Sequence, residues 1–211
     1  MPRTKRSAIE VLRNMPEVFG LSTFQRMNDL ERNQAHVYLS RWGKAGLVQS
    51  AGPRAGIYFN LVREPNAVST RAAEALQLVH GSAVMNGASV LHAAGWTTQI
   101  PHRVTVAALS RETFPQLDAF NVVPRMRSWF EKVSDNAGLN KEGGTYGLPS
   151  LTPAFALADS FKHEDAWRPD PDDLYLDDVD PEEIRRAFKA FRVEIPDWLT
   201  ELLPANERIS P

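Results

Sequence analysis

The 211-residue sequence predicts an α+β protein in two parts. In the first 62 residues, three segments with helical spacing of apolar residues precede two alternating segments joined by a Gly/Pro-rich turn. After residue 72, helical and strand-like segments are mixed without an internal repeat. Pro65 and Asn66 interrupt the pattern between these parts, which predicts a linker over residues 63–72. The predicted domains are therefore residues 1–62 and a mixed α/β domain at 73–211 with an acidic C-terminal tail.

The first two helices are predicted from apolar spacing and from residues that favour helix starts. The first is expected to begin after Ser7, a residue type that caps helix N-termini, and to include Val18 and Phe19. The second is expected to have Ser22 in its capping position and to turn Phe24 and Met27 inward. Both helices would then present one apolar side to a common core.

The third helix is predicted from a regular apolar stripe. Ala35, Leu39 and Trp42 recur at helical spacing, and Tyr38 could extend the stripe. Gly46 is expected to end the helix, because glycine is favoured just after a helix C-terminus. Opposite the stripe, polar residues recur at the same spacing. The helix is therefore predicted to be amphipathic.

Three helices followed by a hairpin are the order of elements in the winged helix-turn-helix fold, which predicts DNA binding. Amide side chains on the polar face of the third helix suit adenine edges, and basic ones suit guanine or phosphate. The hairpin tip and the N-terminal arm add further basic residues. A winged helix that binds protein, with a solvated helix face, is the alternative. The candidate DNA-contacting residues are Arg3, Lys5, Arg6, Asn33, Gln34, His36, Val37, Ser40, Arg41, Lys44 and Arg54.

The charge distribution also separates the two ends of the chain. Residues 1–62 carry nine Lys/Arg against four Asp/Glu, whereas residues 144–211 carry seven against fifteen. A basic N-terminal part suggests that only this part faces a polyanion. The chain has no cysteine, which excludes disulfides and thiolate-bound zinc and fits a reducing compartment. Without an apolar run of about 18 residues or a signal-peptide core, the expected location is cytoplasmic, with no membrane partner.

The second domain is expected to alternate between helices and short strands. The final helix is amphipathic, and Asp180 with Glu183 resembles an N-cap with a capping-box carboxylate. Another helix should start at Pro153, because proline is favoured in the first turn, with Thr152 as its N-cap. The predicted helices are 70–79, 86–94, the segment from Pro153 and the segment from about Pro181, and the predicted strands are 103–108 and 120–124.

The sequence offers no catalytic constellation, cofactor motif or metal site. His92 and His102 are separated by a turn with no acidic residue between them, so we interpret both as structural. The acidic segment 170–183 lacks the glycine and ligand spacing of a calcium loop. Asp159 and His163 lie four residues apart on a predicted helix, where they could form an acid/base pair or a surface ion pair. The expected protein is therefore not an enzyme.

Residues 82–107, SAVMNGASVLHAAGWTTQIPHRVTVA, resemble the segment that follows the DNA-binding domain in the AbiEi family of bacterial antitoxins. The resemblance rests on an ordered set of motifs, and the N-terminal winged helix also matches. The acidic tail departs from the family pattern. The matching motifs are the small-residue helix Ala88–His92, the turn Gly95–Thr97, the Pro-basic-basic step Pro101–Arg103, the strand Val104–Ala107 and the later Ala-Leu-x-Asp segment at Ala156–Asp159.

The resemblance implies that the two domains have different functions. In AbiEi proteins, which belong to type IV abortive-infection toxin–antitoxin pairs, the winged helix represses the operon by binding inverted repeats in its promoter. The second domain neutralises a nucleotidyltransferase-like toxin, often without a stable complex. A ligand-responsive winged-helix regulator is the alternative function, with a pocket lined by Trp129, Phe130, Tyr146 and Phe155.

Overall fold

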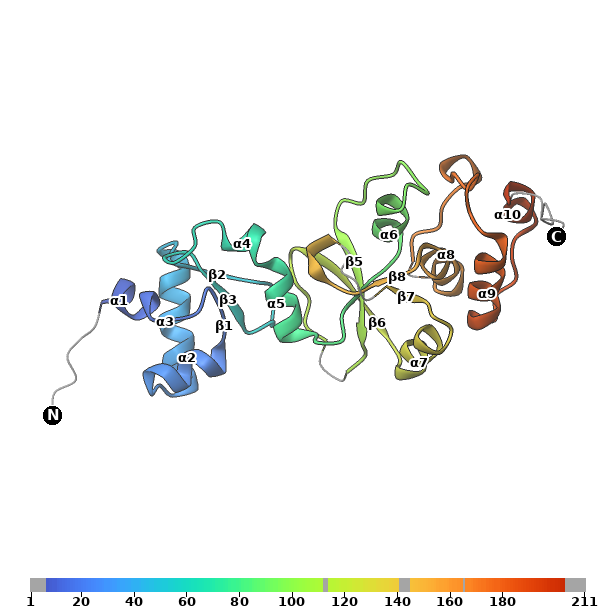
Figure 1. Ribbon diagram of the computed structural model, residues 1–211. Helices are drawn as coiled ribbons and strands as arrows, with labels where there is room; N and C mark the ends of the chain where they lie inside the picture. Colours follow the sequence, from blue (N-terminus) through green and yellow to red (C-terminus); the bar gives the residue numbers. More distant parts are fainter. Residues whose placement is uncertain (1–6, 112–113, 141–144, 165, 204–211) are drawn as a thin grey trace. The chain divides into compact units, whose positions relative to one another are not determined.

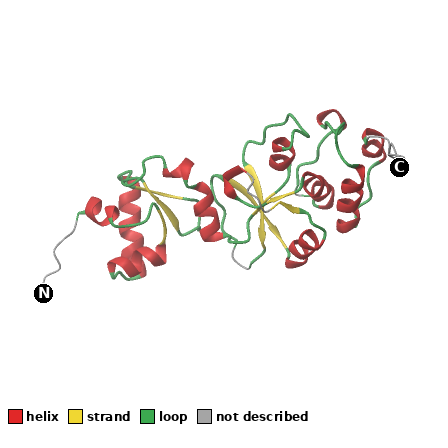
Figure 2. Ribbon diagram, in the orientation of Figure 1, coloured by secondary structure: helices red, strands yellow, loops and turns green. Residues whose placement is uncertain are grey.

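The computed structural model is a mixed α+β structure with two β-sheets and several short helices (Figures 1 and 2). The predicted α+β class is thereby confirmed at this level. In the described part of the chain, no helix is both long and apolar enough to cross a membrane. The residues that the structure describes are 7–111, 114–140, 145–164 and 166–203.

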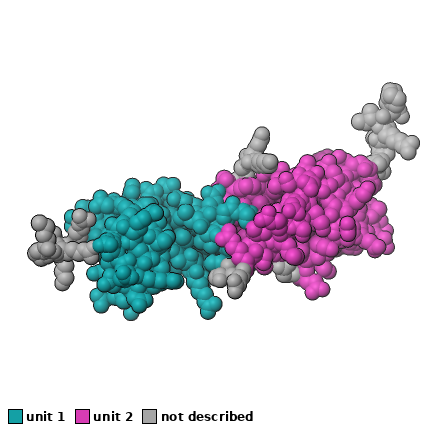
Figure 3. All heavy atoms as spheres, turned by 90° about the horizontal axis from the view of Figure 1, so that it is seen from below, with its two compact units in different colours: residues 1–82, 112–121 teal, residues 83–111, 122–211 magenta. Residues whose placement is uncertain are grey.

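The chain divides into two compact units (Figure 3). Unit 1 comprises residues 1–82 and 112–121, and unit 2 comprises residues 83–111 and 122–211. The chain therefore leaves unit 2 once, after β5 (Val104–Leu109), and the segment that it contributes to unit 1 ends inside β6 (Phe120–Arg125).

The expected linker at 63–72 is occupied by structure that belongs to unit 1. Helix α4 spans Ala67–Thr70, and α5 follows at Ala72–Val79. Helix α5 packs against the sheet of unit 1 and buries Ala75 and Leu76. Pro65 and Asn66 do interrupt the chain, but the apolar face of α5 holds the following residues on the same core.

Unit 1 combines helices with a three-stranded antiparallel sheet in the order β1-β3-β2. The expected hairpin is present as β2 and β3, where Gln49 pairs with Phe59. Ser7 caps α1 as predicted, its hydroxyl accepting a hydrogen bond from the Glu10 amide at 3.2 Å. The remaining elements of unit 1 are α1 (Ala8–Arg13), β1 (Val18–Gly20), α2 (Leu21–Asn28), α3 (Arg32–Lys44), β2 (Val48–Ser50) and β3 (Ile57–Asn60).

Strand β1 replaces the end of the helix expected over residues 7–19. Helix α1 stops at Arg13, and Phe19 pairs with Tyr58 of β3. Pro16 explains the break, because proline disfavours helical geometry at the residue before it. The start of the second helix also differs from the prediction: Gly20 is the N-cap residue of α2, and Ser22 lies inside the helix.

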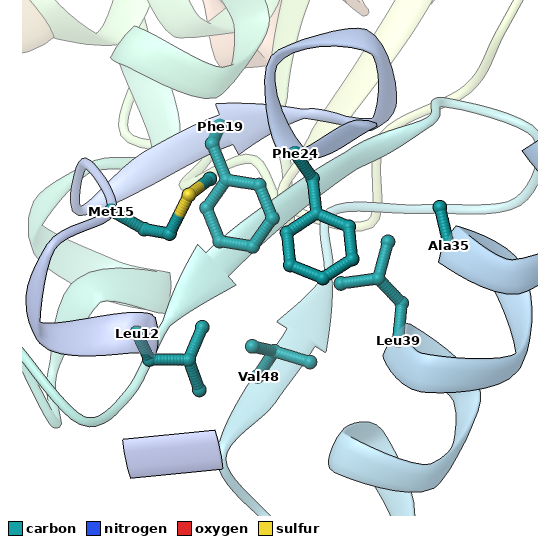
Figure 4. Packing of buried hydrophobic residues seen from close by; sticks show 7 residues of the cluster. All are labelled: Leu12, Met15, Phe19, Phe24, Ala35, Leu39 and Val48. Carbon is teal, nitrogen blue, oxygen red and sulfur yellow. The ribbon is translucent and has the colours of Figure 1, made fainter. Parts of the chain in front are cut away.

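The core of unit 1 is formed by side chains from its helices and strands (Figure 4). Trp42 is partly buried and packs edge-on against Phe24, with ring centroids 5.3 Å apart. Met27, expected inside, is 50% exposed, because it lies in the last turn of the short α2. Tyr38 is 42% exposed at the border of the buried stripe. The core cluster comprises Leu12, Met15, Phe19, Phe24, Ala35, Leu39 and Val48.

Unit 2 contains a five-stranded sheet in the order β6-β5-β4-β8-β7. Strand β4 pairs antiparallel with β5 and parallel with β8. The helices and strands predicted for this region are present, with small shifts at their ends. Three two-residue strands were not predicted, since two residues carry no periodicity. The elements are β4 (Val84–Met85), α6 (Ala88–Ala93), β5 (Val104–Leu109), β6 (Phe120–Arg125), α7 (Arg127–Asp135), β7 (Leu139–Asn140), η1 (Thr145–Gly147), β8 (Ser150–Leu151), α8 (Pro153–Lys162), η2 (Pro171–Asp173), α9 (Pro181–Phe191) and α10 (Asp197–Leu202).

Helix α8 forms the centre of the unit 2 core. Its residues 154–160 are all buried, and α9 packs alongside it. Thr152 is its N-cap residue and Pro153 its first residue, as predicted. Phe155 and Phe191 meet edge-on with ring centroids 5.7 Å apart. A helix buried on all sides, as α8 is, can carry a polar side chain only where partners from neighbouring elements satisfy it.

Candidate nucleic-acid interface

Helix α3 is the longest helix of unit 1, and its ends are fixed by local interactions. At its N-terminus, the Glu31 amide donates to the Gln34 side-chain oxygen at 3.3 Å. At its C-terminus, Gly46 follows the cap in the left-handed region, with φ of +69°. Ala35 and Leu39 are buried against the core, which sets the rotation of the helix. The opposite side therefore faces solvent.

Six of the candidate residues form one stripe on this solvent side, named here the exposed α3 face. They recur at positions i, i+3, i+4, i+7, i+8 and i+11, so they share one side of the helix. All six are exposed. The exposed α3 face consists of Asn33, His36, Val37, Ser40, Arg41 and Lys44.

Gln34, the seventh candidate on α3, is exposed but contributes to the helix start. Its carbonyl oxygen is engaged by the Glu31 amide. A side-chain amide needs both its oxygen and its NH₂ group to bind an adenine edge in bidentate fashion. We therefore assign Gln34 to helix capping and not to the predicted contact with DNA.

Arg54 lies at the tip of the β2–β3 turn, as expected. It is exposed and has a left-handed backbone with φ of +58°. The base of the turn is closed by the Ser50 hydroxyl, which donates to the Gly52 carbonyl at 3.0 Å. The predicted basic arm of Arg3, Lys5 and Arg6 lies outside the described residues.

The basic side chains of unit 1 differ in whether they form ion pairs with acidic side chains. Within the described part of the chain, Arg41, Lys44 and Arg54 form no ion pair. By contrast, Arg71 contacts Glu17 at 2.5 Å and Glu64 at 2.9 Å. The cations of α3 and the hairpin tip therefore keep their charge available to an external anion.

A segment of residues 114–121 supports the base of the hairpin turn. The Asp118 amide donates to the Ala51 carbonyl at 2.9 Å. A Cβ added at Gly52 would lie 2.4 Å from the Gln116 carbonyl oxygen and 2.9 Å from the Leu117 Cα. Local sequence patterns do not reveal this support, because residues 51 and 118 are far apart along the chain.

Unit 2 contains a buried polar cluster centred on Asp159, which is 1% exposed. Its carboxylate accepts hydrogen bonds from Trp129 Nε1 at 2.6 Å, Asn86 Nδ2 at 2.6 Å and Arg125 at 3.1 Å. His163 Nε2 lies 3.4 Å from the same carboxylate. Asp159 and His163 therefore do not form a surface ion pair, because one partner lies in the core. A carboxylate with this many partners is suited to holding four elements together.

The other polar candidates have structural contacts. His92 is exposed, and its Nδ1 lies 3.3 Å from the Thr97 carbonyl oxygen, while His102 is exposed beside the start of β5. Among the described residues, no group of three or more His, Cys, Asp or Glu side chains is placed to hold a metal ion. Asp180 caps α9 by accepting from the Glu182 amide at 2.9 Å, and this bond does not involve Glu183.

A cavity of about 210 Å³ with a mainly apolar lining lies in unit 2. It differs from the aromatic pocket expected for a ligand-responsive regulator: Trp129 and Phe155 are buried in the core, and Tyr146 is 51% exposed. None of the four aromatic residues lines this cavity. Its lining consists of Met85, Val90, Ala93, Ala94, Asn140, Ser150, Leu151 and Pro153.

Comparison with known proteins shows a likeness of fold. No protein-family model matches the chain, and no curated protein matches it. The crystal structure of the RV2827C protein from Mycobacterium tuberculosis is similar over 92% of this chain and 78% of its own chain. The TM-score is 0.50 and the sequence identity is 17%. At this identity the likeness concerns the fold alone.

Proposed function

We propose that this protein is a transcription regulator that binds double-stranded DNA through unit 1. In this proposal unit 1 is a winged helix-turn-helix, with α2 and α3 as the helix pair and the β2–β3 hairpin as the wing. The observation that carries the proposal is the exposed α3 face, which has hydrogen-bonding side chains near its start and two cations near its end. Such a face fits the major groove, where a recognition helix reads base edges and contacts phosphates.

The charge distribution supports DNA as the polyanion. Phosphate contacts supply much of the affinity of a DNA-binding protein. These contacts are made by basic side chains that are not already paired with acidic side chains of the same protein. Arg41, Lys44 and Arg54 meet this requirement within the described residues. The acidic character of residues 144–211 leaves unit 1 as the part suited to DNA.

We further propose that the protein is an antitoxin of the AbiEi kind that represses its own operon and neutralises a nucleotidyltransferase-like toxin. The support is the sequence resemblance over residues 82–107 and at Ala156–Asp159. These segments provide β4, α6, most of β5 and the middle of α8. The proposal assigns DNA binding to unit 1 and neutralisation of the toxin to unit 2.

DNA binding by α3 is tested with Arg41→Ala and Lys44→Ala, measured by fluorescence anisotropy on the DNA upstream of the protein's own gene. Arg41→Ala should weaken specific binding by roughly 1–3 kcal/mol if Arg41 reads a base. Lys44→Ala should lower the slope of log affinity against log salt by about 1 if Lys44 contacts a phosphate. Lys189→Ala, an exposed lysine of α9, is the matched control. Affinities equal to wild type for both α3 variants would show that this face does not bind DNA.

The antitoxin role is tested separately with the Arg41→Ala/Lys44→Ala double variant in the full chain. Coexpressed with a nucleotidyltransferase-like toxin encoded beside the gene, the variant should rescue growth as well as wild type. The same variant should fail to repress a reporter driven by the operon promoter. Loss of rescue in a folded variant would contradict the assignment of neutralisation to unit 2.

A further inference from the structure

The exposed α3 face contains one residue whose chemistry differs from that of its neighbours. Val37 is 48% exposed and lies between Asn33 and Ser40 along the stripe. Valine is a weaker helix former than alanine, because its branched Cβ restricts χ1 in a helix. At this exposure, the side chain also contributes little to the core. Neither helix stability nor packing therefore explains a valine at this position.

The position of Val37 corresponds to the part of a recognition helix that reaches bases. Asn33 is the second residue of α3, and Val37 follows one turn later, about 6 Å along the axis at 1.5 Å per residue. This spacing corresponds to roughly two base-pair steps of 3.4 Å. Residues near the start of a recognition helix contact base edges, so Val37 is placed among them.

The major groove offers one apolar partner for such a side chain. Thymine is the base with a methyl group in this groove, and aliphatic side chains contact it there. Adenine in turn offers N6 and N7, which a side-chain amide such as that of Asn33 can bind. Gln34 does not compete for this role, because its oxygen caps the helix.

We propose that Val37 selects a thymine by contacting its 5-methyl group, and that Asn33 reads an adenine within two base-pair steps. This inference rests on the proposed function, because it assigns sequence preference to the same α3 face. The recognised DNA would then contain specified A·T pairs, with Arg41 and Lys44 contacting guanine or phosphate farther along the helix.

The test removes only the methyl group. A duplex selected by the wild-type protein from a random-sequence pool is resynthesised with uracil in place of each thymine in turn. At one position, the replacement should lower wild-type affinity roughly fourfold, the equivalent of about 0.8 kcal/mol for one buried methyl group. Val37→Ala should bind the thymine duplex with the same reduced affinity and show no further loss with uracil. Because Val37 is half-exposed and alanine favours helices, this variant should fold.

Ile9→Ala provides the matched control, since Ile9 is 45% exposed on α1 and lies off the α3 face. This variant should keep the wild-type response to uracil. Specific binding without a uracil effect at any position, or with the effect retained in Val37→Ala, would overturn the inference and leave DNA binding intact. A wild-type protein that selects no duplex from the pool would instead overturn the proposed function.

Discussion

Asp159 joins four elements of unit 2 through its carboxylate. Asn86 precedes α6, Arg125 ends β6, Trp129 lies in α7, and Asp159 itself lies in α8. Burial of the carboxylate and the Arg125 guanidinium is tolerated because the two groups pair with each other, the carboxylate accepts from neutral donors, and Arg125 Nη1 donates to the Pro124 carbonyl oxygen. Asp159 therefore links these elements by polar contacts in an otherwise apolar core.

At this residue, we predict that Asp159→Asn lowers the free energy of unfolding by about 3–5 kcal/mol. The substitution preserves the size of the side chain, but it leaves the Arg125 guanidinium buried without its charge partner. Urea denaturation followed by tryptophan fluorescence measures the change. Asp177→Asn, in an exposed position, should unfold like wild type. Equal midpoints for Asp159→Asn and wild type would show that the cluster does not stabilise unit 2.

At the scale of elements, α4 and α5 are attached to unit 1 by an ion cluster as well as by apolar packing. Arg71, between the two helices, contacts Glu17 before β1 and Glu64 after β3. The Thr70 hydroxyl also donates to Glu64. The Thr70 and Arg71 hydrogen bonds lower the pKa of Glu64 below its ordinary value of 4.5, and the hydrogen bond to Glu64 raises the pKa of Arg71.

This shift predicts a pH dependence of stability. The pKa of Glu64 is lowered in the folded state, so the ionised Glu64 side chain adds to the free energy of unfolding. This contribution is complete above pH 4.5 and is lost as the pH falls through the lowered pKa of the folded state. Glu64→Gln should therefore show a smaller loss of stability than wild type when the pH is lowered from neutral to below 4. Urea midpoints across this range measure the difference. Glu10→Gln, an exposed substitution in α1, is the control, and identical pH profiles for wild type and Glu64→Gln would contradict the prediction.

At the scale of the whole molecule, the chain path is not a simple succession of two domains. After β5, the chain enters unit 1 before it completes the unit 2 sheet with β6. In the inserted segment, the Phe114 ring packs against the His80 ring with centroids 4.8 Å apart, and the Pro115 carbonyl oxygen lies 2.9 Å from His80 Nε2. The same segment bonds to Ala51 beneath the hairpin turn. Unit 1 is thus completed by residues far along the chain.

Gly52→Ala tests whether this segment supports unit 1. Its Cβ would overlap the backbone at Gln116 and Leu117, so we expect a loss of roughly 1–3 kcal/mol in unfolding free energy, typical of overpacking. Hydrogen exchange at the Asp118 amide should become faster, because its bond to Ala51 would be disturbed. Gly43→Ala is the control: its Cβ would lie 3.8 Å from the nearest atom, and alanine should stabilise α3 by about 0.5–1 kcal/mol. Unchanged stability and exchange in Gly52→Ala would show that the segment gives no support.

Whether a feature could be predicted from the sequence depends on how long its local sequence pattern is. The third helix and its polar side were predictable, because helical periodicity within thirteen residues reveals both faces. Strand β1 was missed, since three residues after a proline give too short a pattern to separate from the preceding helix. The capping role of Gln34 had a local signal, a glutamine three residues after the N-cap residue Glu31.

The sequence by itself determined the exposed α3 face and the start of α8 at Pro153, because apolar spacing and capping are local properties. Only the tertiary structure decided the environment of Asp159, whose partner Asn86 lies 73 residues away, and the support of Ala51 by residues 114–121. Such contacts form when distant segments pack on a shared core. No local spacing encodes that pairing, because it depends on how the whole chain closes.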